Sequence, residues 1–217
     1  MINWVNVVHT TAGVVTILQF ASEAFVLHAV KDVWLEDYCK TCPIIPFLGS
    51  AVASMLYMQY GNMLQDGTMT LVYTVGLLVN IVLMCPICYH TASEYGKAKY
   101  MRIIGVAVAL TCGILCYVRY EDPTEVEFRF GIIRTIVQLL VVATPMIFFG
   151  DGRPARAEDL WFPSLLLGFV AMLSWALYGL LLGNHTLVAE KLSAMIIYMY
   201  IISVHSPYGG EFRWLRE

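Results

Sequence analysis

Seven apolar stretches, each long enough to cross a lipid bilayer, constrain the fold of this chain more than any other feature of its sequence. A membrane-spanning helix needs roughly 20 mostly apolar residues, and clusters of charge mark where each stretch ends. The sequence therefore predicts an all-α membrane protein of seven transmembrane helices. We expect these helices at approximately residues 8–30, 43–64, 69–90, 101–120, 130–150, 160–183 and 187–204.

The overall composition agrees with a membrane protein and excludes several other classes. Hydrophobic residues make up 59% of the 217 positions and charged residues only 13%, so most of the outer surface must face lipid. The formal net charge of −3 gives no basic footprint for nucleic acid, and we expect no nucleic-acid partner. Six cysteines, of which Cys112 and Cys116 lie in an apolar stretch, give no disulfide framework. The lipid bilayer is the first predicted partner.

The distribution of Lys and Arg predicts the orientation, because cytoplasmic loops collect these residues. Nine of the 13 fall on one predicted face, whereas only Arg119 and Arg129 fall on the other. The C-terminus, with a short tail at 207–217, is therefore expected in the cytosol and the N-terminus outside. An acidic loop at 121–127 would face outward. The nine cytosolic cations are Lys31, Lys40, Lys97, Lys99, Arg102, Arg153, Arg156, Arg213 and Arg216.

An internal repeat is visible at an offset of 118 residues. It makes the second and third predicted helices correspond to the sixth and seventh. We infer two parallel three-helix repeats, residues 1–92 and 130–206, joined by an inversion-linker helix at 101–120. Such repeats are a transporter arrangement, with a solute site near mid-membrane. Identical pairs are Val52/Val170, Ala53/Ala171, Tyr60/Tyr178, Gly61/Gly179, Leu64/Leu182 and Thr68/Thr186.

The repeated residues also carry a family resemblance. They are Pro46-Phe47-Leu48, Tyr57 and Tyr60-Gly61 in the first copy, Pro163, Trp175 and Tyr178-Gly179 in the second, and Thr144-Pro145 between them. This pattern resembles the SWEET family of sugar uniporters, in the PQ-loop (MtN3/saliva) superfamily, over nearly the whole chain. The resemblance implies a non-enzymatic transporter that moves a mono- or disaccharide by alternating access without a cofactor. It also implies a homo-oligomer in the plasma membrane, with the Golgi as an alternative.

The resemblance also names the candidate solute-binding residues. Tyr57 and Trp175 are the matched aromatics that would stack on a sugar ring. Where the family places an Asn in the third and seventh helices, this chain has Tyr73 and Lys191. A different small polar solute, or an anionic one, is therefore the alternative cargo on the same fold.

The hinge and gate residues follow from the same comparison. Proline inside a helix removes a hydrogen bond and bends the helix, so Pro46, Pro145 and Pro163 are the predicted hinges, although proline is also common in membrane helices. Glu23 stands where the family has a fourth hinge proline. Pro86 is expected to mark a helix end. Predicted extracellular gate residues are Tyr60, Gly61 and Gly179, and tight helix packing would also explain the two glycines.

Ionisable residues at membrane depth are rare and costly, so Glu23 and Lys191 are functional candidates. Their expected depths differ too much for a direct pair. Glu190 or Arg134 is the expected neighbour of Lys191. The alternative is that Lys191 merely extends to the outer membrane surface.

Two other classes of function and one metal site each have a possible feature in the sequence. A seven-helix photoreceptor would attach retinal to a lysine such as Lys191, but the third predicted helix offers no acidic counter-ion. An intramembrane enzyme has no support, because the five histidines fall at helix ends and form no catalytic group. Two CxxC pairs, Cys39/Cys42 and Cys85/Cys88, are too far apart in sequence for a short zinc ribbon, so no metal is expected.

The predicted orientation can be tested by labelling. A cysteine introduced between residues 121 and 127 should react with a membrane-impermeant thiol reagent applied from outside, whereas one introduced beside Arg153 should not. The unmodified chain serves as the control for labelling of its native cysteines. The opposite labelling pattern would reverse the orientation.

Overall fold

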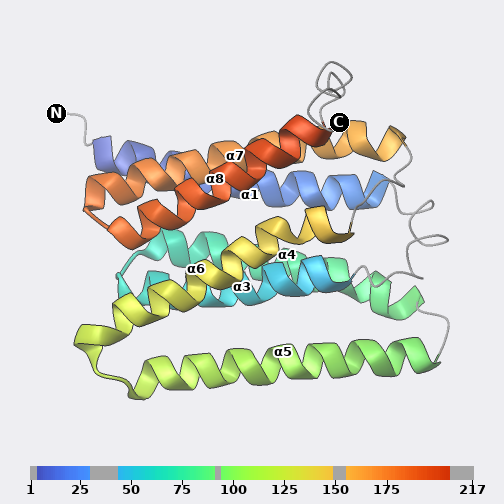
Figure 1. Ribbon diagram of the computed structural model, residues 1–217, viewed down its shortest axis with the longest axis horizontal. Coiled ribbons are helices and arrows are strands. Elements are labelled where there is room, and N and C mark those ends of the chain that lie inside the picture. Colours follow the sequence, from blue (N-terminus) through green and yellow to red (C-terminus); the bar gives the residue numbers. More distant parts are fainter. Residues whose placement is uncertain (1–3, 30–43, 91–93, 149–154, 206–217) are drawn as a thin grey trace, which may run out of the picture. The chain divides into compact units, whose positions relative to one another are not determined.

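The computed structural model describes residues 4–29, 44–90, 94–148 and 155–205, and these residues form seven helices (Figure 1). No strand occurs among them. The all-α, seven-helix architecture predicted from the sequence is confirmed. The helices are α1 (Trp4–Ala29), α3 (Ile44–Met63), α4 (Gly67–His90), α5 (Glu94–Tyr120), α6 (Pro123–Phe148), α7 (Ala155–Leu182) and α8 (His185–His205).

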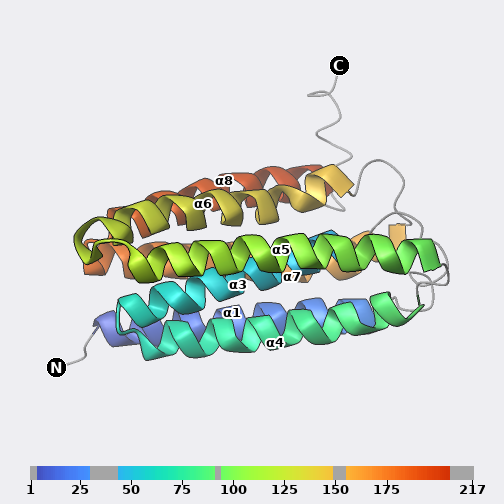
Figure 2. The same cartoon turned by 90° about the horizontal axis from the view of Figure 1, so that it is seen from below.

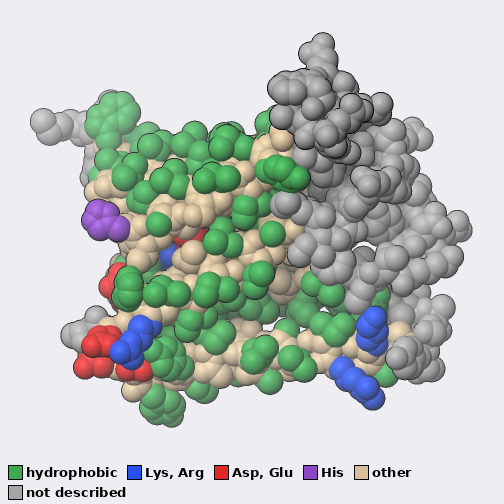
Figure 3. Space-filling model, viewed as in Figure 1, with side chains coloured by type: hydrophobic (Ala, Val, Ile, Leu, Met, Phe, Trp, Pro, Cys, Tyr) green, Lys and Arg blue, Asp and Glu red, His purple; other side chains and the backbone are tan. Residues whose placement is uncertain are grey.

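The surface of the helices is that of a membrane protein. By length and apolar composition alone, five of the described helices could cross a bilayer: α1, α4, α5, α7 and α8. Large apolar side chains cover the helix surfaces (Figure 3), and Leu110 of α5 and Ile196 of α8 are each 64% exposed. Inside a bilayer the backbone polar groups must be satisfied within the segment, which is why these stretches are helical.

Several helix boundaries differ from the sequence prediction. The linker helix α5 begins at Glu94 instead of 101, and α6 begins at Pro123 instead of 130. The predicted 121–127 loop is therefore wrong, since only Glu121 and Asp122 separate α5 from α6. Apolar length marks the bilayer, but a helix continues into water where its residues favour it, and proline is favoured in the first turn. Pro86 lies inside α4, so its prediction as an end marker was also wrong.

Both ends of α5 carry charge. Lys and Arg side chains lie toward the N-terminal end of the helix, whereas Asp and Glu side chains gather beside basic ones at its C-terminal end, in the lower part of Figure 3. Arg129 forms ion pairs there with Glu121 and Glu125. Several residues used for the orientation lie outside the described residues: Lys31, Lys40, Arg153, Arg213, Arg216 and the 207–217 tail, as do Cys39 and Cys42.

The chain divides into two compact units. The first contains residues 1–26 and 142–217, and hence most of α1, the end of α6, α7 and α8. The second contains residues 27–141, and hence α3, α4, α5 and most of α6. The first helix of the first predicted repeat, α1, thus lies mostly in the unit that contains α7 and α8 of the second repeat. The first helix of the second repeat, α6, lies mostly in the unit that contains α3 and α4 of the first repeat. The repeat boundaries themselves stay a prediction.

Each unit contains one tight helical hairpin, α3–α4 or α7–α8, and both hairpins are visible in Figures 1 and 2. Gln65 and Gly183, 118 residues apart, both adopt positive φ, 55° and 69°. This left-handed residue ends a helix and lets the next backbone N–H bond back to the last turn. The N–H of Asp66 donates to the Gly61 carbonyl at 2.8 Å, and the N–H of Asn184 donates to the Gly179 carbonyl at 2.9 Å.

The two turns then start the following helices in the same way. The Asp66 carboxylate accepts a hydrogen bond from the backbone N–H of Met69 at 2.8 Å. The Asn184 side-chain carbonyl accepts one from the backbone N–H of Leu187 at 3.0 Å. Both are N-caps, which satisfy a backbone donor that the helix leaves without an intrahelical acceptor. The repeat therefore extends from the sequence to individual hydrogen bonds.

The matched glycines Gly61 and Gly179 allow the two helices of each hairpin to approach closely. A Cβ on Gly61 would lie 2.7 Å from Thr70 Oγ1 and 3.0 Å from the Thr70 backbone nitrogen. A Cβ on Gly179 would lie 3.1 Å from a methyl group of Val188, the residue equivalent to Thr70. Small residues at helix contacts let backbones pack in this way in membranes. The packing role weighed for these glycines is confirmed, and their role in a gate stays a prediction.

Replacing Gly61 with Ala should destabilise the protein by about 1 to 3 kcal/mol, because the added methyl group meets a backbone nitrogen that has little room to move. Gly179→Ala should cost less, since a valine side chain can shift. Unfolding of the purified protein in detergent would measure both. Gly113→Ala on α5 is the control, because its Cβ meets nothing within 4 Å. Equal stability of Gly61→Ala and Gly113→Ala would contradict the packing argument.

Candidate functional site

Tyrosine side chains form the centre of a buried cluster in the second unit. Tyr57 of α3 stacks on Tyr73 of α4, with ring centroids 4.3 Å apart and ring planes 11° from parallel. Both side chains are buried. Tyr60, almost one helical turn after Tyr57, contacts Phe130 of α6 at a centroid distance of 6.4 Å. The predicted site residues Tyr57 and Tyr73 therefore lie together.

Arg134 of α6 completes this cluster. Its guanidinium carbon lies 3.8 Å from the centroid of the Tyr60 ring and 4.8 Å from that of Tyr57. The residue is only 1% exposed. A planar guanidinium over the electron-rich face of a phenol ring is a favourable cation–π contact, stronger where water is excluded. A charged group is thus buried against two of the predicted site aromatics.

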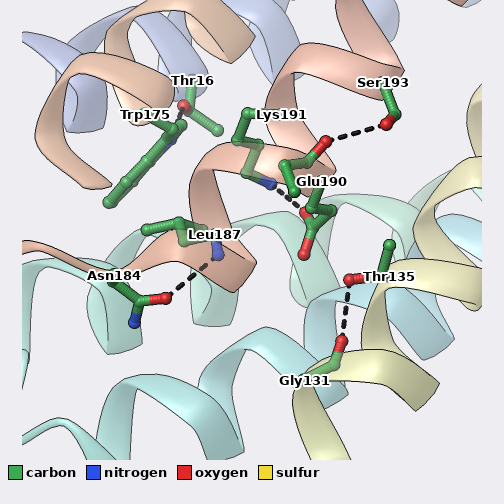
Figure 4. A network of polar contacts seen from close by, with 10 residues as sticks. Thr16, Gly131, Thr135, Trp175, Asn184, Leu187, Glu190, Lys191 and Ser193 are labelled. Atoms are coloured by element: carbon green, nitrogen blue, oxygen red, sulfur yellow. Dashed lines mark hydrogen bonds and ion pairs between the residues drawn. The ribbon is translucent and has the colours of Figure 1, made fainter. Parts of the chain in front are cut away.

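The first unit holds a second cluster, around Trp175 of α7 (Figure 4). The indole Nε1–H donates a hydrogen bond to Thr16 Oγ1 of α1 at 2.9 Å. His9 stacks on Tyr178 with a centroid distance of 4.3 Å and meets the edge of Trp175 at 6.1 Å. Trp175 is fully buried, and its polar N–H is satisfied, as buried indoles require.

A buried ion pair lies in α8 of the same unit. Lys191 Nζ is 2.7 Å from Glu190 Oε1, and both side chains have 0% exposure (Figure 4). Glu190, one of the two neighbours expected from the sequence, is thus confirmed as a partner of Lys191. The alternative in which Lys191 extends to the membrane surface was wrong, because burial beside an opposite charge is available at the adjacent residue. Such a pair must remain intact, since a single buried charge is strongly unfavourable.

The same offset relates the two clusters residue by residue. Tyr57 corresponds to Trp175 and Tyr73 to Lys191, and the offset of 118 also carries Thr16 onto Arg134. The Trp175–Thr16 hydrogen bond and the Arg134–Tyr57 contact therefore join equivalent positions in the two units. The hydrogen bond joins α1 to α7, and the cation–π contact joins the equivalent helices α6 and α3. The pairing of positions is thus repeated, while the type of interaction differs.

Glu23 lies apart from the Trp175 cluster, further along α1. Its Oε1 accepts a hydrogen bond from Gln19 Nε2 at 3.0 Å. The same Gln19 amide lies 3.4 Å from the Tyr198 hydroxyl of α8, within donating distance. The intramembrane carboxylate is thus held in a polar group between α1 and α8, and its role in a gate stays a prediction.

The predicted hinges occupy different places in their helices. Pro163 lies inside α7, eight residues after its first residue. Pro46 is the third residue of α3, and Pro145 lies three residues before the end of α6. Among the described residues, no group of three or more His, Cys, Asp or Glu side chains could hold a metal ion.

The chain resembles known proteins over most of its length. A family model described as "Sugar efflux transporter for intercellular exchange" matches residues 6–94. The protein named "Sugar transporter SWEET1" from Danio rerio is 24% identical over 143 residues, which are 65% of this chain and 64% of that protein. The one of the same name from Drosophila pseudoobscura pseudoobscura is 22% identical over 210 residues, 93% of this chain and 91% of that protein. The one from Dictyostelium discoideum is 19% identical over 170 residues, 75% and 77% of the two chains.

A solved structure shares the fold. The structure titled "The 3.7 A resolution structure of a eukaryotic SWEET transporter" superimposes with a TM-score of 0.76 at 17% identity, covering 96% of this chain and 100% of that one. The chain is similar in sequence to SWEET transporters and shares the fold of one. Its seven helices are therefore those of a SWEET fold, in a multi-pass integral membrane protein.

The structure adds residues that the sequence did not indicate for the site. Thr16 and His9 were missed, because a hydroxyl inside a helix and an imidazole toward a helix end carry no signal of their own. Arg134 was noticed only as a possible neighbour of Lys191, and it contacts the tyrosines Tyr57 and Tyr60. The signal that identifies it is a permanent charge inside an apolar stretch, at the position equivalent to Thr16.

The buried pair gives a direct test of its energetics. Glu190→Gln and Lys191→Met should each destabilise the protein by about 3 to 5 kcal/mol, because each leaves one buried charge without its counter-charge. The double variant should regain most of this loss, since no charge remains. Unfolding by SDS titration would measure all three. Glu125→Gln, in the exposed pair with Arg129, is the control and should change stability little. Additive losses in the double variant would contradict the pairing.

Proposed function

We propose that this protein is a facilitative transporter that carries a mono- or disaccharide down its gradient by alternating access. The observation that carries the proposal is the matched pair of buried clusters, one in each unit, at positions related by the repeat. The names of the three relatives, all sugar transporters, support sugar as the cargo. A uniporter of this kind needs no cofactor.

The chemistry of the clusters suits a sugar. The apolar face of a pyranose ring stacks well on aromatic rings, which Tyr57, Tyr73 and Trp175 provide. Sugar hydroxyls donate and accept hydrogen bonds, and the phenol groups of the tyrosines can do both. The Lys191 ammonium adds donors beside the carboxylate of Glu190. Both clusters thus combine aromatic faces with hydrogen-bonding groups.

Alternating access requires helices that bend on one side of the site and close on the other. We assign the bending to Pro46, Pro145 and Pro163, where a missing backbone hydrogen bond lowers the resistance of the helix to bending. Closure on the other side is assigned to Tyr60 with the close-packed Gly61 and Gly179. Glu23, at the fourth hinge position, would act through its polar contacts with Gln19 and Tyr198.

An anionic solute is the second candidate, and two observations favour it. Lys191 occupies a position at which the family presents an amide, and Arg134 brings a guanidinium to the tyrosines of the other unit. Cations at these positions would favour a solute that bears a carboxylate or a phosphate. A sugar acid is one such solute.

The setting of the transporter is proposed on the same grounds. The nine-to-two distribution of Lys and Arg supports an extracellular N-terminus and a cytosolic C-terminus. The resemblance to SWEET transporters supports a homo-oligomer in the plasma membrane, with the Golgi as the alternative compartment.

Uptake into proteoliposomes tests the proposal. The purified protein should accelerate equilibration of at least one radiolabelled sugar in a panel of neutral sugars, sugar acids and amino acids, without an ion gradient or nucleotide. Empty liposomes are the control. Preferential uptake of a sugar acid would select the second candidate. Uptake of amino acids alone, or uptake that needs an ion gradient, would refute sugar uniport.

The substrate preference should depend on Tyr73 and Lys191. Replacing both with Asn should raise uptake of a neutral sugar, because the site regains the neutral amides of the family and loses the charge that must be neutralised when the site closes. An anionic solute, if it is carried, should lose about 1 to 3 kcal/mol of affinity. Competition for uptake across the sugar panel would measure both effects. An unchanged substrate profile would exclude these two residues from the site.

A further inference from the structure

We propose that Arg134 is a positioning residue for the solute site: its guanidinium fixes the rings of Tyr57 and Tyr60, as the Thr16 hydroxyl fixes Trp175 in the other unit. The proposal rests on the proposed function in one respect, namely that Tyr57 contacts the solute. The contacts themselves are those of the guanidinium carbon, 3.8 Å from the Tyr60 ring centroid and 4.8 Å from that of Tyr57.

The chemistry of each aromatic explains the residue that faces it. Trp175 has a ring N–H, so the residue that holds it must accept a hydrogen bond, and Thr16 Oγ1 does so at 2.9 Å. Tyr57 has no ring N–H and offers the electron-rich face of its ring, which attracts a cation. Equivalent positions 118 residues apart thus carry matched pairs, Trp with Thr and Tyr with Arg.

Arginine suits the second pair better than lysine would. A guanidinium is flat and can contact two rings at once, whereas an ammonium is a compact, strongly hydrated charge. The Tyr57 ring is also stacked on Tyr73, and Phe130, about one turn before Arg134 on α6, contacts Tyr60. Arg134 is therefore placed to hold α6 against Tyr57 and Tyr60 of α3. By this contact it would also fix the orientation of the Tyr57 ring.

Transport kinetics of four variants test this inference. Arg134→Thr should raise the KM for the transported solute by about threefold to thirtyfold, the range expected for loss of a buried cation–π contact, with a smaller effect on Vmax. Arg134→Lys should have an intermediate KM. The double variant Arg134→Thr with Tyr57→Trp recreates the pair of the other unit, and its KM should return toward that of the unaltered protein. Arg129→Gln, at an exposed position on the same helix, is the control and should leave KM unchanged.

A readout independent of transport separates this inference from the proposed function. 3-Fluorotyrosine incorporated at position 57 reports its surroundings by 19F NMR of the protein in detergent. Its signal should shift in Arg134→Thr and less in Arg134→Lys, and should stay in place in Arg129→Gln. If Arg134→Thr does not fold, the fluorine signal is compared in Arg134→Lys, which retains the charge.

The outcomes are distinct. A fluorine signal that stays in place in the folded Arg134 variants overturns the positioning role, whatever the transport result. A double variant that folds yet has the same raised KM as Arg134→Thr also overturns it. A shifted signal in a protein that carries none of the tested solutes supports the positioning role and refutes the proposed function instead.

Discussion

Polar and charged side chains in the apolar helices of this protein must be satisfied by other groups of the protein, and this constraint shapes both units. Within a bilayer, water is not available to solvate them. Lys191 pairs with the adjacent Glu190, Arg134 lies over two tyrosine rings, and the Trp175 indole donates to Thr16. Two of these contacts also hold helices together, because the indole joins α7 to α1 and the guanidinium joins α6 to α3. Stability and the candidate site therefore depend on the same residues.

The repeat gives two similar frameworks that carry different chemistry. The hairpin turns are equivalent down to the left-handed residue, the N-cap and the glycine contact, at Gln65, Asp66 and Gly61 in one copy. Backbone geometry limits these positions to a few residue types, so they remain alike. Side chains that take no part in a turn or cap have no such limit, and Tyr73 corresponds to Lys191. Two similar frameworks thus carry different chemistry at equivalent positions.

The positions at which prediction failed share a physical cause. Apolar length located every described helix, yet α5 and α6 each begin seven residues before the predicted start. Hydropathy reports where lipid ends, whereas helix ends depend on capping and on solvated turns. The prediction for Lys191 included an exposed alternative for a similar reason. A sequence gives the position of a lysine along its helix but not the direction in which the side chain extends.

The sequence by itself determined the seven helices, the 118-residue repeat and the positions of Tyr57, Tyr73, Trp175 and Lys191, because apolar length and residue spacing are properties of the chain alone. It also narrowed the partner of Lys191 to two candidates. Only the tertiary structure decided between them, and only it brought Arg134 to Tyr57 and Thr16 to Trp175. These contacts join residues 77 and 159 positions apart. Periodicity along one helix carries no information about which other helix packs against it, so such contacts arise only when the helices assemble.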